Sequence, residues 1–254
     1  MILAVDIGNT NIAIGGYENE KIKFISRIAT DDRRTSDQYA VELYDIMRIQ
    51  GVSAAQIDGA VIASVVPTVG NALEMAIEKL SGIKPISVGP GVKNGINIKI
   101  DNPAQLGADL VAGAAGALGK YTMPCIVVDM GTATTLTVMD KDGAILGGAI
   151  AAGVGLTLNA LAQNTTLLPS ISIEAPKKII GTNTVECMQS GLVYGTACLI
   201  DGMVERIESE LGERCTVVAT GGRAGQIVCH CKRKMELDDN LLLDGLIKIY
   251  NRNK

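Results

Sequence analysis

The sequence predicts an α/β protein built from two lobes of similar architecture. Short apolar runs with strand character alternate with amphipathic helical segments along the 254 residues. An apolar strand that ends in Asp-x-Gly occurs twice, first at Asp6 and again at Asp129, and a second short strand follows each time. The two Asp are separated by about half of the chain, which suggests one lobe at residues 1–115 and another at 116–254.

Composition narrows the class of protein. Hydrophobic residues make up 47% of the chain and aromatics only 3%, so the core must be mainly aliphatic. The net charge of −4 argues against a nucleic-acid partner, which needs a basic surface. The longest weakly polar stretch, 147–162, is interrupted by Gly, Thr157 and Asn159, so we expect no membrane span. Without a signal-peptide pattern, we expect a cytoplasmic protein whose six Cys are free thiols.

The first lobe is expected to contain three strands, a helix, a buried strand, a second helix and a further strand. The spacing Thr35-x-x-Gln38 predicts a capping box at the start of the first helix. Pro67 is expected to end the buried strand, and Gly82 to end the second helix. One face of the first helix should hold Ala40, Leu43, Tyr44 and Met47. The expected ranges are strands 2–5, 12–16, 21–28, 59–66 and 85–88, and a second helix that includes residues 69–80.

A helix rich in Ala and Gly at 103–120 is expected to join the lobes, packing very closely against its neighbours. In the second lobe, Asn183 predicts the start of a long helix that ends near Leu211. The other elements expected there are strands at 125–128, 136–139 and 216–219 and a last helix that holds residues 241–243 and 247.

The two Asp-x-Gly turns carry the main chemical signal. A Gly-rich turn between strands exposes backbone amides, which are the donors that a phosphate group needs. Hydroxyls at Thr10, Thr132 and Thr134 would add donors, and Asp6 and Asp129 lie at strand ends where they could hold a cation. Two such turns would clamp a polyphosphate. A third element, Ala219-Thr220-Gly221-Gly222, ends a strand in bare backbone against which a base or ribose could lie. Each turn alone is also typical of an ordinary hairpin.

Asp109 is the candidate general base for a hydroxyl acceptor. It lies in an otherwise apolar, small-residue helical segment, where a carboxylate is costly unless it is paired or used. A structural role, with Asp109 paired to a cation or turned to solvent, is equally compatible with the sequence. The single His and the absence of a P-loop motif argue against a Ser-His-Asp hydrolase and a P-loop enzyme.

Two further clusters near the C-terminus favour structural interpretations. Cys229-His230-Cys231 lacks the second ligand pair that zinc sites need, so no metal role is expected. The basic run Lys232-Arg233-Lys234 is typical of solvated surface.

Taken together, these motifs resemble the acetate-kinase, actin and hexokinase superfamily, with its two ribonuclease-H-like lobes of the actin-like ATPase type, mixed sheets flanked by helices. More closely, nearly the whole chain resembles the type III pantothenate kinases. The motifs that carry the resemblance are Asp6–Asn11, Ser64–Pro67, Val88–Gly91, Asn102-Pro103, Gly107–Asp109, Asp129–Thr135, Asn183-Thr184, Met188–Gly191 and Ala219–Gly222.

The resemblance implies ATP-dependent phosphorylation of pantothenate to 4'-phosphopantothenate, the first step of coenzyme A synthesis, with Asp109 as general base. It further implies Mg²⁺ with ATP, a monovalent cation (K⁺ or NH₄⁺) at Asp129, Asp6 as a candidate magnesium ligand, and a homodimer without nucleic-acid or membrane partners. The implied ATP-binding residues are Asp6, Ile7, Gly8, Asn9, Thr10, Asn11, Ile12, Ala13, Thr132, Gly221 and Gly222. The implied pantothenate-binding residues are Gly107, Ala108, Asp109, Leu110 and Thr184.

The chain departs from the family pattern around the acceptor. Leu110 stands where the family usually has Arg, and Ile100 where it has Tyr. Ala152-Gly153 replaces a Pro-Gly pair, and the Arg expected before Leu168-Pro169 has no counterpart. Two alternatives therefore stay open: a kinase of the same fold that acts on another small hydroxyl metabolite, and a non-catalytic nucleotide-binding regulator.

Overall fold

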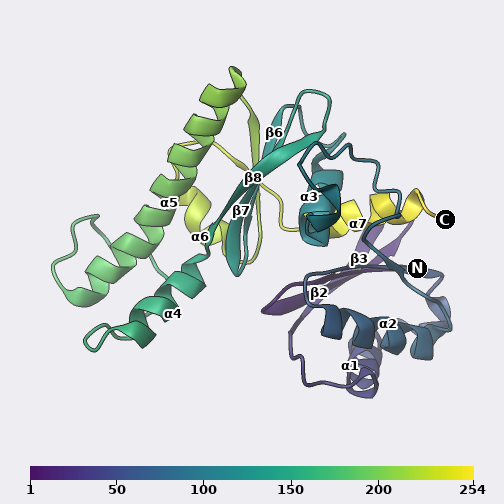
Figure 1. Cartoon of the computed structure of the whole chain (residues 1–254). Helices are drawn as coiled ribbons and strands as arrows, with labels where there is room; N and C mark the ends of the chain where they lie inside the picture. The colour runs from purple at the N-terminus through teal and green to yellow at the C-terminus, as the bar shows by residue number, and fades with distance from the viewer. The chain divides into compact units, whose positions relative to one another are not determined.

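The computed structural model describes residues 1–254 and divides into two compact units, shown in Figure 1. Unit 1 comprises Met1–Lys120 and Asn240–Lys254, and unit 2 comprises Tyr121–Asp239. The elements of unit 1 are β1 (Ile2–Ile7), β2 (Asn11–Glu18), β3 (Lys21–Ala29), α1 (Ser36–Ile49), β4 (Gly59–Ser64), α2 (Pro67–Ser81), β5 (Ile86–Ser87), α3 (Ala108–Ala117) and α7 (Leu241–Asn251). Those of unit 2 are β6 (Cys125–Met130), β7 (Ala133–Met139), β8 (Ile145–Ala152), α4 (Val154–Asn164), α5 (Thr184–Leu211), β9 (Thr216–Thr220), α6 (Ala224–Ile227) and β10 (Glu236–Leu237).

The two units share one sheet topology. Unit 1 holds a five-stranded sheet in the order β3-β2-β1-β4-β5, and unit 2 holds one in the order β10-β9-β6-β7-β8, which is the same sequence read from the other edge. In both sheets the central strand pairs antiparallel with the strand that follows it and parallel with a strand on its other side. The α/β class with two mixed sheets is therefore confirmed.

A shared irregularity strengthens the correspondence between the sheets. The register of β2 against β3 shifts between Gly16 and Tyr17, and that of β7 against β8 shifts between Val138 and Met139. The number of residues from Asp6 to the first bulge differs by one from the number of residues from Asp129 to the second bulge. The β6–β7 turn is one residue shorter than the β1–β2 turn, which accounts for this difference. Because bulges are specific features of a strand pair, this match favours duplication of one ancestral unit.

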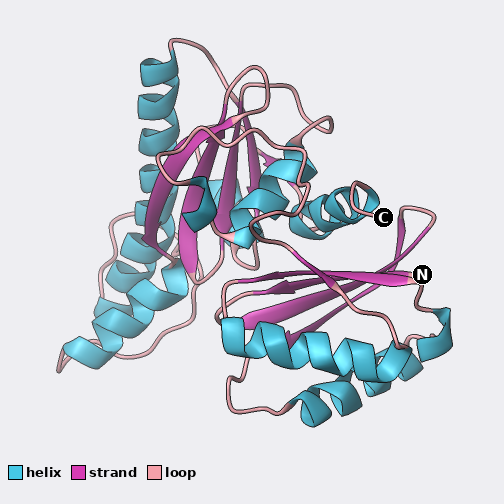
Figure 2. Ribbon diagram, turned by 45° about the vertical axis from the view of Figure 1, so that its right-hand side comes forward, coloured by secondary structure: helices cyan, strands magenta, loops and turns pink.

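Helices cover both faces of the unit 1 sheet (Figure 2). Leu3, Val5 and Ile7 of β1 pack against α1 and α2, whereas Ala4, on the opposite face, packs with residues of α3 and α7. This alternation follows from the two-residue period of a strand. In unit 2, one face of the sheet packs against α4, α5 and α6 through a single aliphatic cluster.

Helix α7 belongs to unit 1, although the sequence placed residues 116–254 in the second lobe. Helix α7 packs against α3 in unit 1 because small residues at their contact let the two helices approach closely. A side chain at Gly245 would lie 1.9 Å from the Ala112 carbonyl oxygen, and one at Gly116 would lie 2.1 Å from that of Leu241. The backbones of α3 and α7 thus approach closely, which sequence periodicity alone does not reveal.

Most helix limits follow local chemistry that the sequence displays. The capping box of α1 is confirmed, because Thr35 accepts from the Gln38 amide and the Gln38 side chain accepts from the Thr35 amide. Gly82 ends α2 in the left-handed conformation, with φ of 71°. Asn183 caps α5 as expected, and its side chain accepts from the Glu186 amide.

Three local expectations were wrong. Tyr44 is half-exposed, and Tyr39 occupies the buried face of α1 instead. Pro67 begins α2 rather than ending the strand, because Pro is favoured in the first turn of a helix. The helix expected at 103–120 is shorter, since Pro103–Gln105 forms a separate 3-10 turn and α3 begins after Gly107. The sequence analysis also missed α4.

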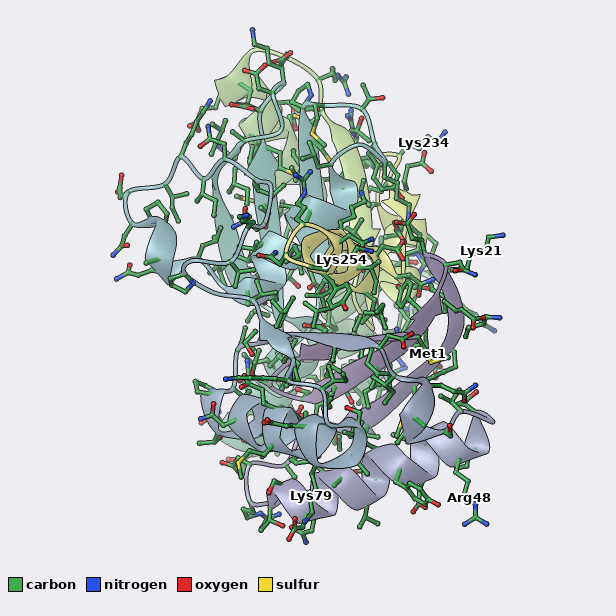
Figure 3. All side chains as sticks on the ribbon, turned by 90° about the vertical axis from the view of Figure 1, so that its right-hand side faces the viewer. Met1, Lys21, Arg48, Lys79, Lys234 and Lys254 are labelled. Carbon is green, nitrogen blue, oxygen red and sulfur yellow. The ribbon has the colours of Figure 1, made fainter.

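Charged side chains lie outward from these layers. Figure 3 shows Lys21, at the β2–β3 turn, and Arg48, in the last turn of α1, extending away from the ribbon. None of the helices combines the length and the apolar composition that crossing a lipid bilayer would require.

The close contact of α3 with α7 can be tested with a single methyl group. Gly245→Ala should lower the free energy of unfolding by about 1–3 kcal/mol, because the added carbon overlaps the Ala112 carbonyl. Gly202→Ala, in α5, is the matched control: nothing lies within 4 Å of the added carbon, and Ala favours a helix by about 0.5–1 kcal/mol. Urea unfolding measures both, and equal stability of the two variants would contradict the packing argument.

Candidate active site

The candidate for the first phosphate loop is the turn between β1 and β2. The Gly8 amide donates to the Asn11 carbonyl at 3.0 Å, and the end of β3 supports the turn. There the Thr30 hydroxyl donates to the Gly8 carbonyl at 2.7 Å and the Thr30 amide donates to that of Thr10 at 3.0 Å. Asn9 and Thr10 are exposed at the tip. The turn is thus held from behind, and its tip faces solvent.

Not every residue of this loop is open to a ligand through its side chain. Ile7 and Ile12 are the last register pair of the hairpin, and both side chains are buried in the core. Any contact that they make with a nucleotide must therefore be through backbone atoms. Asp6, Asn9, Thr10 and Asn11 keep their polar side chains at least partly accessible.

Asp6 lies on the face of the sheet that α3 covers. Its register partners are Ala13 on β2 and Ala63 on β4. These two Ala belong to the same hydrophobic cluster as Ala108, the residue before Asp109. The fold of unit 1 therefore brings the end of β1 and the first turn of α3 to one region, as a phosphate loop and an acceptor base require.

Asp109 is half-buried, and no Lys or Arg pairs with it. Its Oδ1 accepts a hydrogen bond from the Leu110 amide at 2.9 Å. Burial raises the pKa of the carboxyl, and the amide hydrogen bonds oppose that shift only in part. Gly107 leaves room for this carboxylate, because a side chain at that position would lie 2.4 Å from Oδ1. Of the two structural alternatives for Asp109, pairing with a cation is therefore absent.

The candidate for the second phosphate loop, between β6 and β7, is held by the residue that precedes α4. The Gly131 amide donates to the Ala133 carbonyl, and the Gly153 amide donates to the Thr132 carbonyl, both at 3.0 Å. A side chain at Gly153 would overlap the carbonyls of Gly131 and Thr132. Of the hydroxyls considered as donors, that of Thr132 is on an exposed residue, whereas Thr134 is buried, so its hydroxyl is not an open donor.

The support that Gly153 gives to this loop was not predicted from the sequence. There, Gly153 stood out only as part of Ala152-Gly153, where the family has a Pro-Gly pair. A Gly is required at this position because its backbone approaches the carbonyls of Gly131 and Thr132 closely.

The strand end at Thr220-Gly221-Gly222 meets the second phosphate loop within unit 2. Thr220 is the register partner of Asp129, and the Arg223 amide donates to the Met130 carbonyl at 3.2 Å. Gly221 has φ of 95°, and a side chain there would lie 2.4 Å from Asp129 Oδ1. The parallel pairing of β6 with β9 thus brings together two of the segments that the sequence selected.

Thr184 lies elsewhere in unit 2, in the first turn of α5. It lines a hollow of about 720 Å³ between α4, the residues before α5 and α5 itself. Thr157, Thr182 and Asn183 supply polar groups there, and Leu161, Met188 and Leu192 supply apolar ones. This size and mixture suit a small polar metabolite.

The fold and the repeated loops define the class. The chain is a two-lobed, ribonuclease-H-like α/β protein of the actin-like ATPase type. Solved structures share this fold at low sequence identity. They include a Campylobacter jejuni protein described as a candidate Baf family transcriptional activator, with a TM-score of 0.64 and 18% identity over 99% of this chain and 98% of that one. The activator of the 2-hydroxyisocaproyl-CoA dehydratase from Clostridium difficile, with bound ADPNP, has a TM-score of 0.57 and 17% identity over 98% and 93%.

The sequence comparisons are more specific. The family model for type III pantothenate kinase matches residues 2–206. Type III pantothenate kinases from Geotalea uraniireducens and Moorella thermoacetica are each 41% identical, over 254 and 253 residues, and cover 100% of this chain and 99% and 100% of theirs. The chain therefore belongs to the type III pantothenate kinase family, as its motifs predicted.

The junction of β9 with the second phosphate loop should tolerate no side chain. Gly221→Ala places a methyl group against Asp129 and forces a positive φ on Ala, which together should cost about 1–3 kcal/mol or more. Gly222→Ala is the neighbouring control, because nothing lies within 4 Å of its added carbon. Thermal unfolding of both variants measures the difference, and a Gly221→Ala protein as stable as Gly222→Ala would refute the contact.

Proposed function

We propose that this chain transfers the terminal phosphate of ATP to the primary hydroxyl of pantothenate, which gives 4'-phosphopantothenate in the first step of coenzyme A synthesis. Family membership supports the reaction. The observation that carries the catalytic assignment is Asp109, a half-buried carboxylate without a cationic partner, in the first turn of α3.

Asp109 is proposed to act as the general base. A carboxylate accepts a proton best when it is not neutralised by a neighbouring cation, and a raised pKa makes it a stronger base. Gly107, Ala108 and Leu110 surround it and are proposed, with Thr184, to contact the acceptor. The Leu110 amide already fixes one carboxylate oxygen at 2.9 Å, which leaves the other for the hydroxyl.

Residues Asp6–Ala13, with Thr132, Gly221 and Gly222, are proposed to hold the nucleotide. ATP supplies the phosphoryl group, and Mg²⁺ neutralises its charge when bound. The exposed tip at Asn9 and Thr10 and the exposed Thr132 hydroxyl fit this role.

Asp6 is a candidate magnesium ligand. Asp129 offers a carboxylate oxygen at the end of β6, the donor type that hard cations prefer, and is proposed to bind K⁺ or NH₄⁺.

A homodimer is part of the proposal. Large apolar side chains of unit 2 are exposed between β8 and the first turn of α5, and exposed apolar surface of this kind commonly marks an interface. Those side chains are Ile150, Leu156, Leu167, Ile179, Ile180 and Val185.

A cytoplasmic location is also proposed, supported by six cysteines that are all free thiols.

The kinase assignment is tested by ADP release with ATP, Mg²⁺ and K⁺, with and without pantothenate. Release should depend on pantothenate and fall when Na⁺ replaces K⁺. Asp109→Asn should lower kcat by about 10²- to 10⁴-fold, since it removes the base. Asp45→Asn, an exposed residue of α1, is the matched control. Nucleotide binding without pantothenate-dependent release would instead favour another acceptor or a non-catalytic role.

The pH profile gives a second measure of the same residue. As the pH falls through the raised pKa of Asp109, the carboxyl gains a proton and can no longer accept one from the hydroxyl. The acid limb of kcat/KM should therefore lie above the ordinary value for Asp, about 3.9. A profile that stays flat down to that value would show that Asp109 is not the base.

The dimer is tested by introducing charge into the exposed apolar region. Ile179→Asp together with Ile180→Asp should shift the protein from dimer to monomer in sedimentation or light scattering, because burying two carboxylates is costly. Val41→Asp with Ile49→Asp, on exposed positions of α1, is the control and should leave the dimer intact. A monomeric wild-type protein would contradict the proposal directly.

A further inference from the structure

A second hollow, of about 420 Å³, lies in unit 2 at the beginning of β9. The phosphate loop and Gly221 adjoin the opposite end of the sheet, because they follow the last residues of β6 and β9. The hollow is thus a separate feature of the fold. Its lining is Arg214, Cys215, Thr216, Val217, Lys232, Arg233, Lys234 and Glu236.

Two acidic residues of α5 hold the basic segment of this hollow in place. Asp201 accepts the backbone amides of Lys232 and Arg233 at 2.8 and 2.9 Å. Glu208 accepts both the Cys215 amide, at 2.8 Å, and the Arg233 guanidinium, at 2.6 Å. The backbone of the basic run is therefore anchored to α5, whereas the side chains of Lys232 and Lys234 are exposed, as the sequence favoured.

Arg233 ties the hollow together and is already neutralised. Besides its pair with Glu208, its guanidinium donates to the Cys215 carbonyl at 2.6 Å, and its side chain is only 20% exposed. This arrangement connects the residues before β9 to the residues before β10. The positions of the neighbouring cations are thus supported by a partly buried ion pair.

The remaining cations of the lining have no such partner. The side chains of Lys232 and Lys234 make no ion pair, and Arg214 has only a distant contact of 3.7 Å with Glu208 while 81% exposed. Figure 3 shows Lys234 projecting from the ribbon. These three cations outnumber Glu236, the one acidic residue of the lining, so the hollow has an excess of positive charge that attracts an anion.

The chemistry of the hollow selects the kind of anion. Lysine and arginine side chains are the usual ligands of phosphate groups, and a charge-assisted hydrogen bond is about twice as strong as a neutral one. The volume is in the range of small-metabolite sites, so it has room for more than a bare phosphate. Glu236, the one acidic residue of the lining, could accept hydrogen bonds from hydroxyl groups on the organic part.

We propose that this basic hollow of unit 2 binds a small, hydroxylated phosphate monoester, with Arg214, Lys232 and Lys234 around the phosphate and Glu236 at the organic part. The inference does not rest on the kinase reaction. It requires only the anchored basic segment and the charges that surround the hollow.

The test is isothermal titration of the full chain with ribose 5-phosphate, inorganic phosphate and ribose. Ribose 5-phosphate should bind most tightly, and its dissociation constant should rise about tenfold or more in Lys232→Ala with Lys234→Ala. The matched control removes two exposed lysines elsewhere in unit 2, Lys141→Ala with Lys178→Ala, and should bind as the wild type does. Higher ionic strength should weaken binding, because both lysines are solvent-exposed.

Hydrogen exchange locates the binding. Ribose 5-phosphate should protect amides at 214–217 and 232–236, and unchanged melting temperatures should show that the variants are folded. Equal affinity in the lysine double variant, or protection only at the phosphate loops, would overturn the site. Inorganic phosphate that binds as tightly as ribose 5-phosphate would overturn the choice of a monoester. Kinase activity is measured separately, so failure of either proposal leaves the other intact.

Discussion

The central strand of each sheet fixes where chemistry can occur. β1 and β6 are each hydrogen-bonded to an antiparallel strand on one side and a parallel strand on the other, so both strands are held along their whole length at the centre of their sheets. At the carboxyl end of each strand stands an Asp, and the tight turn after it begins with Gly. The neighbouring parallel strand ends at the same edge, which is why Thr220 and Gly221 meet Asp129. Everything proposed for nucleotide binding depends on this pairing.

Much of the fold could be predicted because its signals are local. Capping groups at Thr35 and Asn183, a stop signal at Gly82 and the repeated Asp-x-Gly turns each depend on a few adjacent residues. The two sheets followed from the repeat. Family membership followed from the same motifs, because several had to occur in one order along nearly the whole chain.

The features that sequence reasoning missed depend on contacts between distant residues. The assignment of α7 to unit 1 rests on Gly245 against Ala112, more than a hundred positions away. Likewise, Gly153 supports the second phosphate loop through a backbone hydrogen bond to Thr132. The hollow beside Lys232 and Lys234 was invisible for the same reason, since Asp201 and Glu208 anchor it from another element. Periodicity reports which face is buried, but not what lies against it.

The return of α7 to unit 1 makes unit 2 an insertion within a discontinuous domain. Unit 2 lies in the sequence between the two parts of unit 1, so the ribosome completes residues 121–239 before it supplies α7. Until then, Ala4, Val61 and Ala112 lack the cover that Leu243 and Leu246 later provide. Unit 1, which carries Asp109, is therefore completed only after unit 2 during synthesis, although β1 is made before unit 2.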